Sequence, residues 1–241
     1  MSDQPSDTNA ALHGDRASAT RVTWPDFAIT VAMAVVLYAV GILLLLQVPK
    51  DDSVLAGLAQ FAVSGLAPLG AVLLAIAIRK RKLALFGITR VAPKWLAIAF
   101  AIGLGVVALN IGITSLVSAT TDAADVQANY QSAATSGVAG FIGAILFGAV
   151  LTPIGEEFLF RGVIFNLLKR YGVWLAVILS AAVFAFSHGV NLATPVAFVV
   201  GVSAALLMQK TKSVWPGVIV HAVNNASSTI ISVIYFHMVA S

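Results

Sequence analysis

Residues 152–161 have the sequence TPIGEEFLFR, which places the ionisable side chains of Glu156, Glu157 and Arg161 inside an apolar run. The two glutamates are the only ones in the chain. A charged group at bilayer depth costs at least about 2.5–3.5 kcal/mol on insertion scales, so an ionisable residue there is a functional candidate. We therefore treat the rest of the chain as the scaffold that holds these three groups.

The composition is that of a polytopic membrane protein. Of the 241 residues, 59% are hydrophobic and 10% are charged, and the mean hydropathy is +0.96. A water-soluble domain of this length could not carry so much apolar surface, so we predict an all-α bundle of about seven or eight transmembrane helices around a polar cavity. The chain has no cysteine, which excludes disulfides, a thiolate nucleophile and thiolate metal ligands.

The net charge of +4 comes from basic residues that lie in short clusters between the apolar runs. This pattern indicates membrane topology rather than a nucleic-acid partner. With the N-terminus in the cytoplasm, the positive-inside rule leaves only Lys50 outside and places the C-terminus outside. The basic residues assigned to the cytoplasmic side are Arg16, Arg21, Arg79, Lys80, Arg81, Lys82, Arg90, Lys94, Lys169, Arg170, Lys210 and Lys212.

The first half of the chain divides into a tail and a group of helices. Residues 1–25 are polar and lack the features of a signal peptide, which predicts a disordered cytoplasmic tail. Residues 26–125 are predicted to hold the N-terminal transmembrane helices, over 27–49, 54–78 and 95–119. Each run is long enough to cross a hydrocarbon core of about 30 Å.

Residues 126–241 are predicted to form a second transmembrane unit, the core that carries the polar residues. We assign the polar residues 126–137 to a loop and residues 138–168 to one long helix, with a kink or break at Pro153 and Gly155 that frees backbone groups near Glu156. Residues 171–209 are predicted to form two shorter helices joined by a turn at 188–195. A last helix starts near Pro216, which suits a first helical turn.

The spacing of the polar residues predicts which of them share a helix face. Glu157 and Arg161 are four residues apart on a helix and can form an ion pair. Glu156 is rotated about 100° around the helix axis from Glu157, so it does not share this arginine as easily and is a candidate general base. The alternatives are a structural salt bridge or a proton relay. His188 follows the helix that contains Phe184 and, taken alone, is an ordinary interfacial residue.

His221 and Asn225 lie one turn apart on the last helix, where such a pair normally serves as interhelical hydrogen-bonding glue. Together, the polar groups of these helices suffice for water activation by Glu156 with an imidazole, and for stabilisation of an oxyanion by N–H donors. They also suffice for a metal site made of Glu156, His188 and His221, although no H-E-x-x-H motif is present.

Three motifs occur in order on successive hydrophobic helices: Glu156-Glu157-x-x-x-Arg161, Phe184-x-x-x-His188 and His221-x-x-x-Asn225. In this order they resemble the CAAX protease and bacteriocin-processing family of intramembrane proteases, which includes the type II CAAX prenyl endopeptidases and the abortive-infection proteins. The resemblance covers roughly residues 139–230. The first three spans resemble the family only in being hydrophobic.

The resemblance implies a role for each matched residue. Glu156 would activate the attacking water with help from His188, and Glu157 would orient the site through Arg161. The remaining pair, His221 and Asn225, would stabilise the oxyanion. The family has been discussed with and without a metal; we favour glutamate-activated water, which needs no cofactor, and keep zinc as the alternative.

The implied partners are membrane lipid and a peptide or lipidated protein, which is a prenylated C-terminal tail in the eukaryotic members. We predict an integral protein of a prokaryotic plasma membrane, where a prenylated substrate is not the only choice. The alternatives are processing of a bacteriocin or of another membrane-anchored peptide, and a role in immunity to a bacteriocin. Two rival functions remain: a non-enzymatic scaffold or immunity protein, and a small proton-coupled transporter. The chain shows none of the inverted repeats that would favour the transporter.

Overall fold

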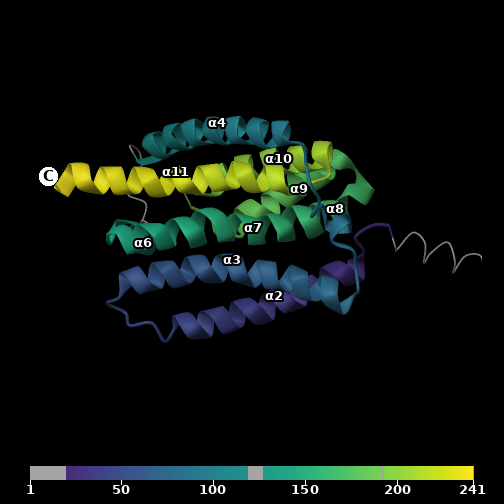
Figure 1. Ribbon diagram of the computed structural model, residues 1–241, viewed down its shortest axis with the longest axis horizontal. Helices are drawn as coiled ribbons and strands as arrows, with labels where there is room; N and C mark the ends of the chain where they lie inside the picture. The colour runs from purple at the N-terminus through teal and green to yellow at the C-terminus, as the bar shows by residue number, and fades with distance from the viewer. Residues whose placement is uncertain (1–19, 119–126, 192, 241) are drawn as a thin grey trace, which may run out of the picture.

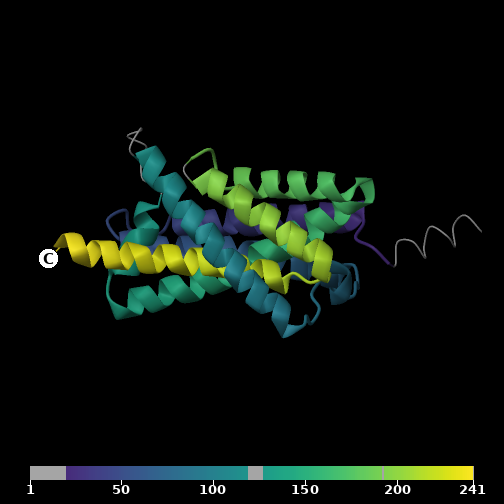
Figure 2. The ribbon, with the colours of Figure 1, turned by 90° about the horizontal axis from the view of Figure 1, so that it is seen from above.

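The computed structural model describes residues 20–118, 127–191 and 193–240. Their helices pack side by side into an elongated bundle (Figures 1 and 2). The elements are α2 (Trp24–Leu45), α3 (Ser53–Ile78), η1 (Leu83–Phe86), α4 (Pro93–Ser118), α5 (Ala128–Thr135), α6 (Val138–Gly143), η2 (Ala144–Leu151), α7 (Thr152–Glu157), η3 (Phe158–Phe165), α8 (Asn166–Leu168), η4 (Lys169–Tyr171), α9 (Val173–Phe186), α10 (Ala193–Thr211) and α11 (Trp215–Ala240).

The predicted all-helical membrane bundle is confirmed. Among the described residues, six helices are long and apolar enough to cross a membrane, including one continuous helix of 34 residues over Val138–Tyr171. Each of the seven predicted spans has its helix, but α9 has only 14 residues. At 1.5 Å per residue α9 covers roughly 21 Å, which is less than the hydrocarbon core of about 30 Å.

Three predicted boundaries change. The first helix begins at Trp24 and ends at Leu45, a few residues earlier than expected. Part of the segment assigned to a loop forms the short helix α5, which packs against α3. The turn between α9 and α10 ends at Ala193, two residues before Pro195. The proposed division of the chain at residues 125 and 126 lies outside the described residues.

Residues 20–25, which were assigned to the tail, make defined contacts with the rest of the bundle. Residues 1–19 lie outside the described residues, but Val22 is 1% exposed and its carbonyl accepts a hydrogen bond from Arg170 Nη2 at 2.7 Å. Asp26 is buried and accepts bonds from the backbone N–H and the hydroxyl of Thr23. The predicted tail therefore extended too far along the chain.

Asp26 also forms ion pairs with two arginines at the end of α3. Its Oδ1 lies 3.3 Å from Arg79 Nε, and its Oδ2 lies 3.2 Å from Arg81 Nη2. A second contact ties the start of α2 to η4, where Trp24 Nε1 donates to the hydroxyl of Tyr171 at 3.1 Å. These contacts fix the N-terminal helix hairpin to the helix that carries the glutamates.

The long helix is not broken at Pro153. Instead, two π-helical stretches, η2 and η3, flank the short α-helical segment α7, and Pro153 lies in the first turn of α7. A π-helix bonds each N–H to the carbonyl five residues earlier, which widens the turn by one residue. The expected break is thus replaced by two widened turns, one before and one after the glutamates.

Glycines bring α7 close to α3. A Cβ at Gly155 would collide with the carbonyl of Gly65, and a Cβ at Gly65 would lie 2.9 Å from Thr152 N. The hydroxyl of Thr152 lies 2.8 Å from Ser64 Oγ and donates to the carbonyl of Phe61. This crossing holds Glu156 and Glu157 in the interior of the bundle.

The other motif helices close around the long helix. Figure 1 shows α11 lying between α4 and the long helix, while α2 and α3 lie on the far side of the long helix. Figure 2 shows that α4 crosses α11 obliquely and that α9 and α10 run next to each other. The elements that carry the three motifs, α7, α11 and the end of α9, therefore come from separate parts of the bundle.

Candidate active site

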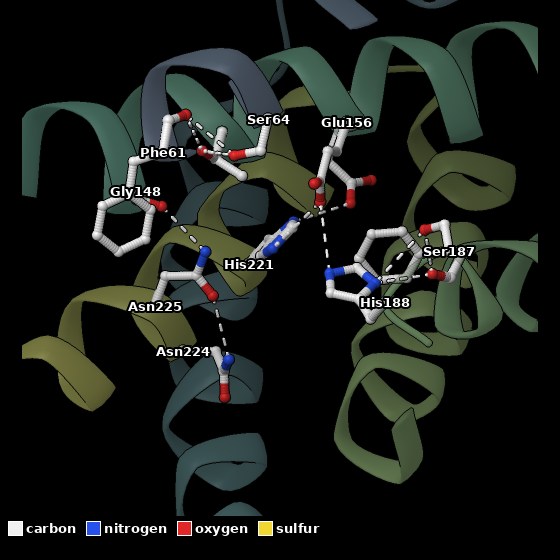
Figure 3. Close-up of polar contacts among 12 residues, drawn as sticks. Phe61, Ser64, Gly148, Glu156, Ser187, His188, His221, Asn224 and Asn225 are labelled. Carbon is white, nitrogen blue, oxygen red and sulfur yellow. Dashed lines mark hydrogen bonds and ion pairs between the residues drawn. The ribbon is translucent and has the colours of Figure 1, made fainter. Parts of the chain in front are cut away.

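The two imidazoles lie on either side of Glu156 (Figure 3). Oε2 of Glu156 is 4.0 Å from Nε2 of His188 and 3.8 Å from Nε2 of His221. Glu156 comes from α7, His221 from α11, and His188 from the turn after α9. The structure therefore brings together three of the predicted residues from parts of the chain that are far apart in sequence.

Glu157 faces away from this gap and pairs with Arg161. Its Oε1 lies 3.1 Å from Arg161 Nη1, and both side chains have 0% exposure. The same Oε1 is 3.5 Å from Nδ1 of His221. His221 thus lies between the two carboxylates, with Nδ1 toward Glu157 and Nε2 toward Glu156, and Glu157 is placed to fix the orientation of the imidazole.

The ion pair fits closely among small residues of three helices. A Cβ at Gly201 of α10 would lie 3.2 Å from Arg161 Nη2 and 2.9 Å from the Cβ of Ala181 on α9. A Cβ at Gly217 of α11 would lie 2.8 Å from Glu157 Oε2. These contacts leave no room for larger side chains beside the pair.

His188 has a defined tautomer in its neutral form. Its Nδ1 lies 2.9 Å from the carbonyl of Phe184, and since a carbonyl only accepts, Nδ1 carries the hydrogen. Burial lowers the pKa of His188 below its ordinary value, the bond to Phe184 opposes this change, and Arg161 adds to the lowering. Neutral His188 therefore presents the lone pair of Nε2 toward Glu156.

The ring of Phe184 is the centre of the site. It makes edge contacts with the rings of His188 at 4.9 Å, His221 at 5.4 Å and Phe160 at 5.0 Å, measured between centroids. The guanidinium carbon of Arg161 lies 4.7 Å from its centroid, within cation–π range. Helical spacing in the sequence indicated only the contact with His188.

The spacing between Glu156 and the two imidazoles suits a bridging water molecule. Glu156 Oε2 is buried and has no hydrogen-bond partner among the described residues. Its distances to the two Nε2 atoms, 3.8 and 4.0 Å, are too long for direct hydrogen bonds. A water about 2.8 Å from Oε2 and from one Nε2 would make an angle of roughly 90° between them, which is suitable for bridging.

The carboxamide of Asn225 bonds to a backbone carbonyl of the long helix and to the neighbouring asparagine. Its Nδ2 donates to the carbonyl of Gly148 at 3.0 Å, and its Oδ1 accepts from Asn224 Nδ2 at 3.3 Å. The contacts of Asn225 therefore run to the long helix and along α11, next to His221, rather than to Glu156 (Figure 3). A carboxamide has two N–H hydrogens, and the bond to Gly148 uses one of them.

The predicted metal ligands do not form a metal site as they stand. In the described part of the chain, no group of three or more His, Cys, Asp or Glu side chains is arranged to hold an ion. Ligands of zinc at about 2.0–2.2 Å in a tetrahedron lie roughly 3.4 Å apart, closer than Glu156 is to either imidazole. The distances around Glu156 therefore do not fit tetrahedral zinc.

The close fit around Glu157 gives a test by a single methyl group. We expect Gly217→Ala to lower the free energy of unfolding by about 1–3 kcal/mol and to reduce any activity of the site, because the new Cβ overlaps Glu157 Oε2 and lies 3.0 Å from the Cβ of Ala204. Thermal unfolding in one detergent measures this change.

The control is Gly105→Ala on α4, where a new Cβ would meet nothing within 4 Å. Alanine favours helix over glycine by up to about 1 kcal/mol, so this variant should be as stable as the wild type or more stable. Equal stability of the two alanine variants would contradict the close packing described around Glu157.

Fold and site together define a polytopic membrane protein with a buried centre of carboxylates and imidazoles. Residues 138–227 match the family model of the type II CAAX prenyl endopeptidase Rce1-like proteins. The match confirms the family resemblance over this segment, which contains every candidate catalytic residue, and it supports a CAAX-type intramembrane protease at the level of the family. No curated protein and no solved structure matches the chain.

Proposed function

We propose that this protein is an intramembrane endopeptidase that hydrolyses a peptide bond with water activated by Glu156. The observation that carries the proposal is the position of Glu156 Oε2 between two Nε2 atoms, 4.0 and 3.8 Å away, inside a bundle of apolar helices. A buried carboxylate whose Oε2 has no hydrogen-bond partner among the described residues, at a spacing from two imidazoles that suits a bridging water, is suited to act as a general base.

The proposed reaction moves one proton at a time. Water attacks the carbonyl carbon of the substrate while Glu156 takes a proton from it, and Nε2 of His188 accepts the other hydrogen bond of the same water. The resulting oxyanion is stabilised by N–H donors of His221 and Asn225. The proton on Glu156 then passes to the leaving amine as the C–N bond breaks.

The charges of the cluster suit this cycle. Glu156 and Glu157 carry two negative charges against the single positive charge of Arg161, so the proton that Glu156 takes from the water makes the group neutral. Neutrality is favoured at a buried site because an uncompensated charge is costly there. The proton that neutralises the cluster is therefore available for transfer to the leaving group.

The proposed substrate is a peptide at the membrane, either a prenylated C-terminal tail of the CAAX type or a related peptide such as a bacteriocin. The family match supports the first. We further propose that the protein lies in the plasma membrane of a prokaryote with its N-terminus in the cytoplasm. The clusters of basic residues support this orientation.

The test is cleavage of quenched-fluorescent peptides by purified protein in lipid. A farnesylated peptide and its unmodified twin are compared, each with and without a chelator. We expect cleavage of at least one peptide, retained in the chelator. Activity that is lost in chelator would replace glutamate-activated water by a metal mechanism. Failure to cleave any member of a broad peptide panel would favour a non-enzymatic scaffold.

A further inference from the structure

A line of side-chain hydrogen bonds connects α4 to the long helix through α11. The hydroxyl of Thr114 donates to Asn110 Oδ1 at 3.1 Å, and Asn110 Nδ2 donates to Asn224 Oδ1 at 3.4 Å. The line continues from Asn224 Nδ2 to Asn225 Oδ1 at 3.3 Å and from Asn225 Nδ2 to the carbonyl of Gly148 at 3.0 Å. Every bond runs in the same direction.

The direction of this line is fixed at the carbonyl of Gly148, which receives neither of the donors that an α-helix or a π-helix would supply. In an α-helix the N–H of Thr152 would donate to the carbonyl of Gly148, but here that N–H donates to the carbonyl of Phe147. In a π-helix the N–H five residues later would serve it, but that residue is Pro153, which has none. The amide of Asn225 supplies the missing hydrogen.

This end point decides the orientation of every carboxamide in the line. A carbonyl only accepts, so Asn225 must turn Nδ2 toward Gly148 and Oδ1 toward Asn224. Asn224 must then present Nδ2 to Asn225 and Oδ1 to Asn110. A rotation of Asn225 by 180° about its last bond would place two acceptors, Oδ1 and the Gly148 carbonyl, against each other, which is unfavourable away from water.

We propose that Asn224 and Asn110 are positioning residues that hold the carboxamide of Asn225 in one orientation. The inference deepens the proposed function, on which its catalytic consequence rests: the fixed amide keeps its second N–H ready for the oxyanion next to His221. Neither Asn224 nor Asn110 belongs to the three sequence motifs. Because both asparagines lie on apolar helices, bonding to each other satisfies their polar groups within the bundle.

The kinetic test removes the middle of the line. Leucine has nearly the shape of asparagine and no hydrogen-bonding groups, so Asn224→Leu breaks the line with little change in packing. We expect Asn224→Leu to lower kcat roughly tenfold and to leave KM nearly unchanged. This loss is smaller than the roughly hundredfold loss of kcat expected for Asn225→Ala, because that variant removes an oxyanion donor. The matched control on the same helix is Ser232→Ala, since the hydroxyl of Ser232 bonds only locally, to the carbonyl of Ser228.

A double-mutant cycle separates positioning from general support of the fold. If Asn224 acts through Asn225, then adding Asn224→Leu to Asn225→Ala costs no further activity, and the two effects are not additive. Additive losses, or a loss equal to that in Ser232→Ala, would overturn the proposal.

A second measurement is independent of activity. In protein labelled with ¹⁵N-asparagine, the side-chain amide resonances of Asn225 are assigned by their disappearance in Asn225→Ala. We expect Asn224→Leu to shift them and to speed their exchange with water, while the resonances of Asn166, whose Nδ2 donates to the carbonyl of Gly162, stay unchanged. Unchanged Asn225 resonances would overturn the positioning role even if the wild type cleaves peptides.

If the wild type cleaves none, the proposed function fails while these spectra still decide the positioning role.

Discussion

Glu156→Gln is expected to lower the rate of peptide hydrolysis by roughly a thousandfold, within the range of about 10²–10⁴ that general acid–base catalysis contributes. Glutamine keeps the shape and the hydrogen-bonding capacity of the side chain but cannot take a proton from water. KM should change little, because the substituted group acts on the water rather than on the substrate. The measurement is single-turnover cleavage of the best peptide by both proteins in the same lipid.

Folding has to be held constant in this comparison. The variant should keep the unfolding temperature of the wild type, because glutamine is neutral in a site where Glu156 is buried and Oε2 lacks a partner among the described residues. A variant that cleaves within twofold of the wild type would remove Glu156 from the mechanism. Uptake that depends on a pH gradient and is lost in the variant would instead favour a proton relay.

Arg161→Leu is expected to lower the free energy of unfolding by about 3–5 kcal/mol, because it leaves the carboxylate of Glu157 buried without its partner. The double variant with Glu157→Leu should recover most of this loss. Replacement of a buried ion pair by apolar side chains is often neutral or stabilising, whereas removal of one partner is not. Chemical denaturation in mixed micelles measures all three proteins and the wild type.

Activity should separate from stability in this series. We expect the double variant to be stable but nearly inactive, since the carboxylate 3.5 Å from His221 Nδ1 is then missing. If the double variant is as unstable as Arg161→Leu, the cost comes from lost packing of the guanidinium on Phe184 and Gly201 rather than from the unpaired charge.

Much of the site could be predicted from the sequence because a membrane restricts where polar groups can lie. A helix that crosses lipid must turn its ionisable side chains toward other helices, so Glu156, His188 and His221 had to face the bundle interior. Their order on successive spans then predicted that they meet. The spans themselves followed from the length of the charge-free runs.

The direction of Asn225 could not be predicted in the same way. It depends on which carbonyl of the long helix lacks a donor, and this depends on the π-helical register of η2. One signal was present, since Pro153 follows Gly148 by five residues. Without the register, however, the same proline equally suggested a break near Glu156.

The ion pairs of Asp26, and the contacts of Phe184 beyond His188, escaped prediction for a different reason. The partners of Asp26 are Arg79 and Arg81, at the far end of the next helix, and next to an apolar run the residue is indistinguishable from an interfacial aspartate. Phe184 contacts side chains from three elements, but spacing within its own helix indicates only one of them. Contacts between distant segments carry no periodic signal.

The contacts at the start of α2 have a consequence for insertion of the chain into the membrane. Asp26 can pair with Arg79 and Arg81 as soon as the first hairpin has been synthesised. Val22 instead bonds to Arg170, 148 residues later, and Trp24 bonds to Tyr171, 147 residues later. The hairpin therefore enters the membrane before its final contacts exist. Those contacts form only after the helix that carries the glutamates has been inserted, so the first hairpin reaches its final packing late in the insertion of the chain.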